Sequence, residues 1–109
     1  MEYEFVYDER LGIRLPYLYA EWETYSRETQ AEILFEWEAI RGTIPERIEE
    51  LENEINEKQA RLGQEEDFAT SCQLNSEISE LASIINDLWI WFRTRQTIEM
   101  TDEKNGTNE

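Results

Sequence analysis

The start of the chain alternates between apolar and polar side chains, which is the period of a β-strand. The alternating apolar positions are Tyr3, Phe5, Tyr7, Ile13 and Leu15. Turn-forming residues separate the two runs, and Gly12 among them is free to adopt a positive φ. This pattern predicts a short β-hairpin or an extended arm over residues 3–15. Pro16 would then stand in the first turn of a helix.

Apolar residues recur at helical spacing over residues 17–41. They form two stripes, which consist of Leu18, Trp22 and Tyr25 and of Ile33, Trp37 and Ile40. Ser26 lies between the stripes and is a good N-cap residue, so we expect either a kink or two helices here. Gly42 is expected to end this segment.

Two further helices are predicted, from Pro45 to about Leu62 and from Phe68 to about Gln96. Gly63 would stop the first, and Asp67 would cap the second. The apolar residues of the first have heptad spacing, with Lys58 at one position of the seam. A short connection makes the two helices antiparallel neighbours. The expected contacts join Ile48, Leu51, Ile55 and Leu62 to Phe68, Leu74, Ile78 and Leu81.

Residues 81–92 are apolar on almost every side of the predicted last helix. Such a helix must be surrounded, and one narrow seam cannot do this. We therefore expect a mainly α fold, a coiled-coil-like antiparallel helical hairpin packed with the N-terminal helices. Residues 1–98 would form one domain, with an aromatic head (1–42 and 81–96) and a two-helix arm (45–80). Residues 99–109 are predicted to be a disordered acidic tail.

Charge changes this picture by limiting the partners. The 109 residues include 26 Asp and Glu against 10 Lys and Arg, a formal net charge of −16. Such a charge repels phosphate backbones, so direct nucleic-acid binding is disfavoured. The longest apolar run near the C-terminus, residues 88–92, is too short to span a membrane. A single cysteine, Cys72, fits a packing residue in a cytoplasmic protein.

The sequence lacks the residues that most catalytic mechanisms require. There is no histidine, which excludes the usual catalytic triads and the commonest general base. One cysteine cannot build a structural zinc site, and the four glycines are too isolated for a phosphate loop. The sequence therefore predicts no catalytic or cofactor-binding residues.

A magnesium site made only of carboxylates is the exception, since Mg²⁺ needs one or two carboxylates plus substrate phosphates. The weak candidates are Glu46, Glu49, Glu77, Glu80 and Asp87. Their paired Glu-x-x-Glu spacing resembles that of the all-α nucleotide pyrophosphohydrolases, and this resemblance implies Mg²⁺-dependent hydrolysis of nucleotides. The same residues fit solvated helix faces, which is the interpretation we favour.

Two other polar patterns are open to two interpretations each. Asn86 and Asp87 interrupt an apolar run. They either line a pocket, or occupy a wet stripe of the helix, or pair with Arg41, Arg47 or tyrosine hydroxyls. Three glutamates repeat along one helical face, namely Glu28, Glu32 and Glu36. They are either a docking stripe for a basic partner or an exposed face that keeps the protein in solution.

The predicted helical pair also carries a resemblance. Its Leu- and Glu-rich first helix, the acidic turn over residues 65–67 and Trp91 near the end of the pair are similar to the coiled-coil hairpins appended to soluble ABC-type translation ATPases. That resemblance covers residues 44–91 and implies an antiparallel two-helix arm.

Taken together, these patterns favour a non-catalytic interaction or regulatory protein. Its partner would be another protein or a second copy, with a homodimer as the expected assembly. One alternative is the Mg²⁺-dependent nucleotide hydrolase. Another is an acidic mimic of nucleic acid that binds a basic protein.

Overall fold

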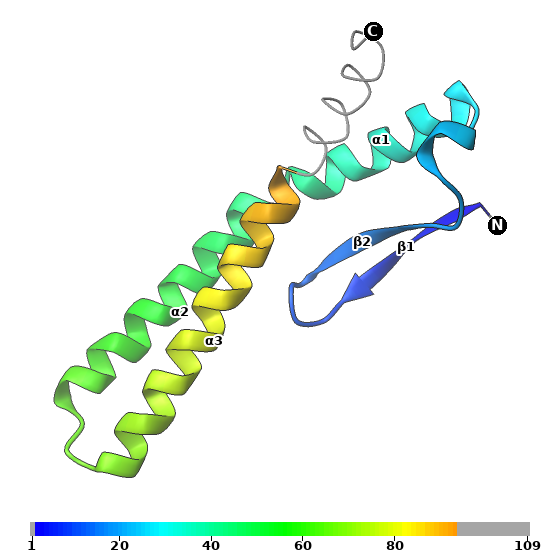
Figure 1. Cartoon of the computed structure of the whole chain (residues 1–109). Coiled ribbons are helices and arrows are strands. Elements are labelled where there is room, and N and C mark those ends of the chain that lie inside the picture. Colours follow the sequence, from blue (N-terminus) through cyan, green and yellow to red (C-terminus); the bar gives the residue numbers. More distant parts are fainter. Residues whose placement is uncertain (1, 94–109) are drawn as a thin grey trace, which may run out of the picture.

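The computed structural model describes residues 2–93. This part of the chain is mainly helical, with a short N-terminal antiparallel β-hairpin (Figure 1). After the hairpin come a long bent helix, labelled as α1 (Arg27–Arg41) and α2 (Ile44–Gln64), and one further helix, α3 (Phe68–Phe92). Its extents of 60 × 32 × 20 Å make an elongated molecule. The predicted tail over residues 99–109 and the end of the last predicted helix lie outside the described residues. In the described part, no helix is long and apolar enough to cross a membrane.

The alternating N-terminal segment is a hairpin. Strand β1 (Tyr3–Asp8) pairs with strand β2 (Ile13–Leu18), from Tyr3 opposite Leu18 to Asp8 opposite Ile13. In the turn, the amide of Gly12 donates to the carbonyl of Asp8 at 2.7 Å, and the amide of Leu11 donates to the Asp8 side chain at 2.8 Å. Of the two alternatives that the sequence left, the extended arm is therefore wrong.

The prediction of a helix beginning at Pro16 is also wrong, because β2 continues through that residue to Leu18. Proline is tolerated here because a two-stranded sheet leaves the outer edge of each strand without a hydrogen-bonding neighbour. The Tyr25 hydroxyl then holds the chain after β2. It donates to the carbonyl of Glu2 at 2.6 Å and accepts the amides of Tyr19 at 3.1 Å and Ala20 at 3.2 Å.

Helical structure starts later than the apolar stripe suggested. A short 3-10 helix, η1 (Trp22–Thr24), precedes helix α1 (Arg27–Arg41). The side chain of Ser26 caps α1 by accepting the amide of Thr29 at 3.1 Å, which confirms the predicted N-cap. The Leu18–Tyr25 stripe therefore belongs to a strand end, a link and a 3-10 turn.

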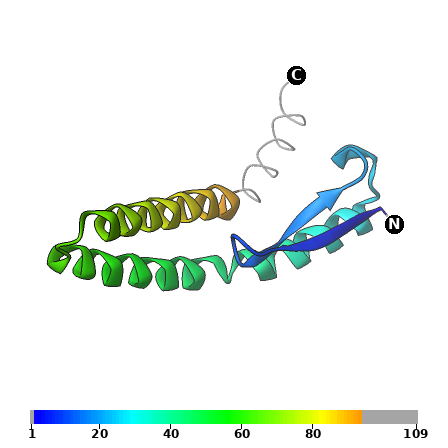
Figure 2. The ribbon, with the colours of Figure 1, turned by 90° about the horizontal axis from the view of Figure 1, so that it is seen from below.

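Helices α1 and α2 (Ile44–Gln64) follow one another almost end to end (Figure 2). The two residues between them, Gly42 and Thr43, keep right-handed helical angles, so the chain bends without reversing. Pro45 is accommodated because the first turn of a helix lacks partners for its amides. Gly63 does not stop α2 as predicted, since the helix runs one residue beyond it.

Helix α3 (Phe68–Phe92) returns beside α2, in the opposite direction (Figures 1 and 2). The Asp67 side chain caps it, as predicted, by accepting the amide of Thr70 at 2.9 Å. This hydrogen bond and a second one from the Thr70 hydroxyl hold the pKa of Asp67 below its ordinary value. Phe68 is 81% exposed, so its predicted place in the seam is wrong. The coiled-coil-like packing of the two helices stays a prediction.

One apolar core connects the hairpin to all three helices. Its buried members are Leu11, Ile13, Leu15, Trp37, Ile40, Ile44, Ile48, Leu51, Ile84 and Leu88. Trp37 meets Trp91 of α3 edge to face, with 5.7 Å between the ring centroids. The core thus draws on residues from both the predicted head and the predicted arm.

The prediction that the end of α3 is surrounded fails on its outward side. Trp89 is 39% exposed and Ile90 is 50% exposed. Arg10, in the turn between the strands, makes polar contacts with α3. The apolar surface of Trp89 and Ile90 stays in contact with solvent.

The turn of the hairpin leaves no room for a side chain at Gly12. Its φ is +79°, and an added Cβ would lie 2.6 Å from Nε of Arg47. We expect Gly12→Ala to lower the free energy of unfolding by about 1–3 kcal/mol, measured by urea denaturation. Gly63→Ala is the matched control, because nothing lies within 4 Å of its Cβ position. It should leave stability unchanged or raise it by up to about 1 kcal/mol. Equal stabilities for the Gly12 variant and the wild type would contradict the described turn.

Candidate functional site

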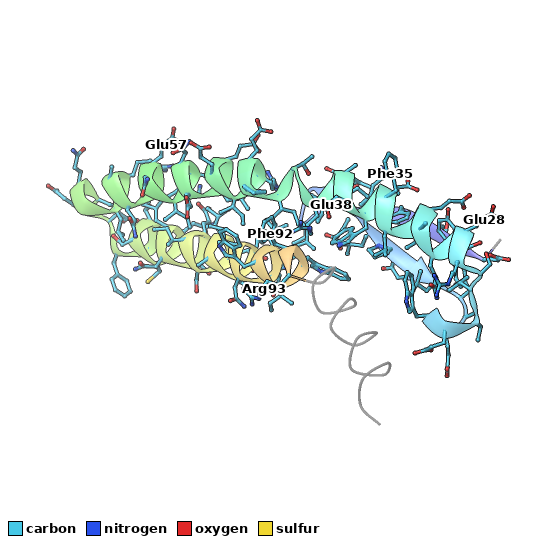
Figure 3. The ribbon with its side chains drawn as sticks, turned by 90° about the horizontal axis from the view of Figure 1, so that it is seen from above. Glu28, Phe35, Glu38, Glu57, Phe92 and Arg93 are labelled. Atoms are coloured by element: carbon cyan, nitrogen blue, oxygen red, sulfur yellow. The ribbon has the colours of Figure 1, made fainter. Side chains whose placement is uncertain are left out.

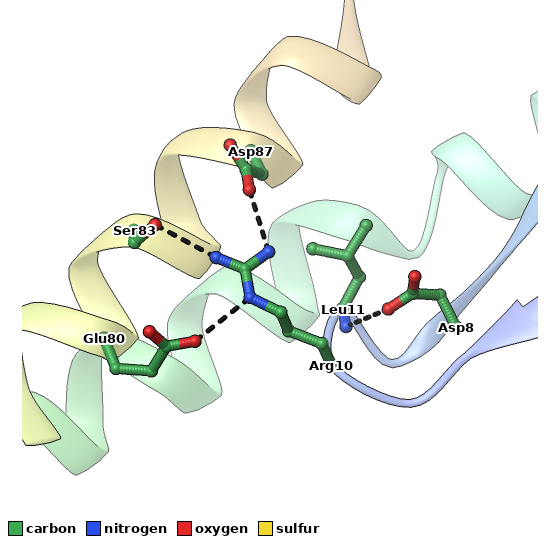
Figure 4. A network of polar contacts seen from close by, with 6 residues as sticks. All are labelled: Asp8, Arg10, Leu11, Glu80, Ser83 and Asp87. Carbon is green, nitrogen blue, oxygen red and sulfur yellow. Dashed lines mark hydrogen bonds and ion pairs between the residues drawn. The ribbon is translucent and has the colours of Figure 1, made fainter.

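Two of the candidate magnesium ligands, Glu80 and Asp87, form ion pairs with an arginine (Figure 4). The Arg10 guanidinium donates from Nε to Glu80 at 3.0 Å and from NH1 to Asp87 at 2.8 Å. Its third nitrogen donates to the Ser83 hydroxyl at 3.0 Å. These three acceptors lie along one flank of α3, and the hairpin turn presents Arg10 to all of them.

The arginine of this network is always charged, because a guanidinium stays protonated in proteins. Its hydrogen bonds to Asp87 and then to Glu80 raise the pKa of Arg10 further above its ordinary value. A permanently charged guanidinium with two carboxylates is a docking contact between the hairpin and α3. It offers neither a general base nor an open metal position.

The predicted arginine partners of Asp87 are engaged elsewhere. Arg47 donates from Nε to the carbonyl of Leu11 at 2.9 Å, on the other side of the hairpin turn. Arg41 donates to the carbonyl of Phe92 at 3.1 Å and lies over its ring, 4.7 Å from the centroid. The prediction failed because it considered only arginines of nearby helices and not the one in the turn. Asn86 is exposed and lines no described cavity.

Glu77 lies further along α3 and is paired across to α2. Its carboxylate accepts a hydrogen bond from Nζ of Lys58 at 2.9 Å and another from the side-chain amide of Gln73 at 2.8 Å. These contacts, with Gln73 the larger and Lys58 the second, hold the pKa of Glu77 below its ordinary value. The lysine that interrupts the α2 seam therefore has its counter-charge on the facing helix.

The other two magnesium candidates, Glu46 and Glu49, are exposed on α2. Within residues 2–93, no group of three or more acidic, cysteine or histidine side chains is gathered closely enough to hold a metal ion. Cys72 is exposed on α3 rather than packed, contrary to expectation.

A different set of residues lines an open, solvent-accessible cavity of about 550 Å³ between the start of the hairpin and α1. We call it the acidic cavity. Its lining consists of Glu2, Tyr3, Glu4, Phe5, Arg14, Thr29, Glu32 and Glu36. Four of these side chains are carboxylates and one is a guanidinium, so the cavity is negative. Two rings, Tyr3 and Phe5, meet edge to face at 6.1 Å and give it an apolar part.

The acidic cavity already holds one cationic group of the chain itself. Arg14 donates to Glu36 at 3.0 Å, and its Cζ lies 5.9 Å from the centroid of the Phe5 ring. Partial burial, followed by the charges of Glu32 and Glu36, raises the pKa of Tyr3 above its ordinary value. The Arg14–Glu36 pair and the charges of Glu32 and Glu36 acting on Tyr3 indicate a negative potential beside an aromatic surface, the environment that favours a cation.

Sequence reasoning found part of this site. The stripe of Glu28, Glu32 and Glu36 was identified, and the structure brings the second and third of these residues to the cavity. It missed Tyr3, Phe5 and Arg14, because only the packing of the hairpin against α1 brings them there. No protein-family model matches this sequence, and neither a curated protein nor a solved structure matches it significantly.

The lowered pKa of Glu77 predicts a pH-dependent contribution to stability. A carboxylate whose pKa is lowered by folding stabilises the protein above its unfolded pKa, and this contribution is lost as the pH falls through the folded value. Glu77→Gln should therefore be less stable than the wild type at neutral pH. The difference should shrink as the pH falls below the ordinary value of 4.5.

Urea denaturation at several pH values measures this difference. Glu57→Gln, on the side of α2 that faces away from α3 (Figure 3), controls for the loss of one negative charge. A deficit in the Glu77 variant that is the same at all pH values would contradict the assignment.

Proposed function

We propose that this protein is a non-catalytic interaction protein whose partner places a lysine or arginine side chain in the acidic cavity. The observation that carries the proposal is the binding of Arg14 by Phe5 and Glu36 in that cavity. A partner's cation would use the remaining ring and carboxylates in the same way. The volume of the cavity lies within the range of about 300–1,000 Å³ that is typical of ligand sites.

The net charge of −16 supports the same partner. A negative field steers positively charged proteins toward the molecule and repels phosphate backbones. A basic protein is therefore favoured over a nucleic acid. A cytoplasmic location belongs to this proposal as well, since the single cysteine suits a reducing compartment.

The positions of the acidic residues on α3 argue against the hydrolase alternative. Glu80 and Asp87 are bound by Arg10, and Glu77 is bound by Lys58. Ligation of Mg²⁺ by these residues would require each carboxylate to give up its present partner. Glu46 and Glu49 would also need to reach the same ion from α2.

A short basic peptide tests the binding proposal. A labelled peptide with two lysines should bind saturably, and its affinity should fall as salt is added. Replacing Tyr3 by Leu and Glu32 by Gln together should weaken binding about tenfold, because one cation–π contact and one partly exposed ion pair are lost. Fluorescence anisotropy measures the affinity.

The matched control makes the same two changes away from the cavity. Phe35→Leu with Glu57→Gln also removes one exposed ring and one negative charge, and both side chains point to solvent (Figure 3). This variant should bind like the wild type. Equal losses in the two double variants would mean that the peptide senses only the overall charge, and the cavity would not be the site.

Thermal unfolding with Mg²⁺ distinguishes the hydrolase alternative. A specific site would stabilise the folded state by an amount that grows with the ligand concentration. We expect about 5 mM Mg²⁺ to raise Tm no more than NaCl at matched ionic strength, since both would act only by screening. A rise specific to Mg²⁺ that Glu80→Gln or Glu49→Gln removes would support the hydrolase instead.

A further inference from the structure

Helix α3 carries a second line of residues at heptad spacing, on the side turned away from α2. We call it the outward face of α3. Its members are Phe68, Cys72, Asn75, Ser79, Ala82, Asn86 and Trp89. All seven are exposed, and none carries a charge. Ile90, beside the last of them, is 50% exposed.

This face is unusual for the chain to which it belongs. The exposed positions of α2 include the acidic residues Glu46, Glu49, Glu50, Glu52, Glu54 and Glu57. Solvent-exposed helix faces are normally polar and charged, as α2 is here. The nearest exposed acid on α3 is Glu80, which lies on the flank beside this face and is bound by Arg10. The outward face is therefore a neutral strip on a strongly acidic molecule.

The residues of the strip are arranged so that it matches its own reversed copy. Large apolar side chains lie at both ends of the face: Phe68 at the N-terminal end of α3, and Trp89 with Ile90 near its C-terminal end. Small or short polar residues fill the middle, around Ser79. When two such helices lie antiparallel, Phe68 of one copy faces Trp89 and Ile90 of the other. The small central residues allow the two helices to approach closely.

We propose that the outward face of α3 is the interface of an antiparallel two-fold homodimer, with its axis near Ser79. A second copy fits this face for an electrostatic reason. Two molecules of charge −16 repel each other, and this repulsion is smallest where the contact surface of each carries no charge. A two-fold dimer is also the commonest homo-oligomer. This site lies on a different helix from the acidic cavity and does not depend on the proposed function.

The size of the face indicates a weak dimer. A helix of 25 residues is about 37 Å long, and a face about 10 Å wide gives roughly 400 Å² per copy. A standard interface buries about 800 Å² per partner, so we expect a dimer that dissociates at micromolar concentrations. Salt should strengthen the association, because it screens the repulsion between the acidic surfaces.

Sedimentation equilibrium from about 1 to about 100 μM, at low and moderate salt, tests the association. Ala82→Glu adds a charge to the interface of each copy and should weaken the dimer at least about tenfold, since like charges would be brought together. Gln59→Glu adds the same charge to an exposed position of α2 and should leave the dimer unchanged. A single 13.1 kDa species throughout, or equal weakening by the two variants, would overturn the proposal.

Disulfide trapping tests the orientation. Cys72 and Asn86 are each seven residues from Ser79, so in the antiparallel dimer each faces the other across the interface. Asn86→Cys, with Cys72 retained, should give a covalent dimer under mild oxidation. The wild type should not, because the two Cys72 residues would be about 21 Å apart along the helices, beyond the reach of a disulfide. Rapid cross-linking of the wild type would indicate parallel helices and overturn the antiparallel arrangement.

Discussion

The docking of the hairpin turn on α2 and α3 is the constraint on which the rest of the structure depends. Arg10 reaches three side chains of α3, and Arg47 of α2 binds the carbonyl of Leu11. The Leu11 side chain is buried in the apolar core. The positive φ of Gly12 lets the turn close while Arg47 lies against it. Through this contact the hairpin and α1 join the α2–α3 pair in one core.

The same contact decides what the acidic residues can do. In an isolated helix, Glu80 and Asp87 would be free carboxylates on one face, which is the pattern of a metal site. In the folded chain they hold an arginine, and Glu77 holds a lysine. In the acidic cavity four carboxylates face one guanidinium, so the negative charge there exceeds its fixed counter-charge. For this reason the proposed role of the cavity is to bind a cation with its rings and carboxylates.

The two proposed surfaces divide the molecule by charge. The acidic cavity lies at the hairpin and α1, where aromatic rings and carboxylates occur together. The outward face of α3 is apolar at its ends and uncharged throughout, and neither the hairpin nor α2 covers it. A basic partner and a second copy can therefore bind to different helices, because each surface selects by a different interaction.

Local signals in the sequence determined much of the secondary structure. The Ser26 and Asp67 caps, the alternation over residues 3–15 and the heptad spacing of α2 act between residues close in the chain, so they can be recognised without a fold. The absence of histidine likewise limited the chemistry at once. The strand through Pro16, the partner of Asp87 and the lining of the acidic cavity were decided only by tertiary structure. Each depends on which distant segments meet: Tyr25 holds the link after β2, and Arg10 reaches α3 from a turn more than seventy residues earlier. Periodicity shows which side of a helix is apolar, but not how much of that side its neighbours cover, and for this reason the exposed end of α3 was missed.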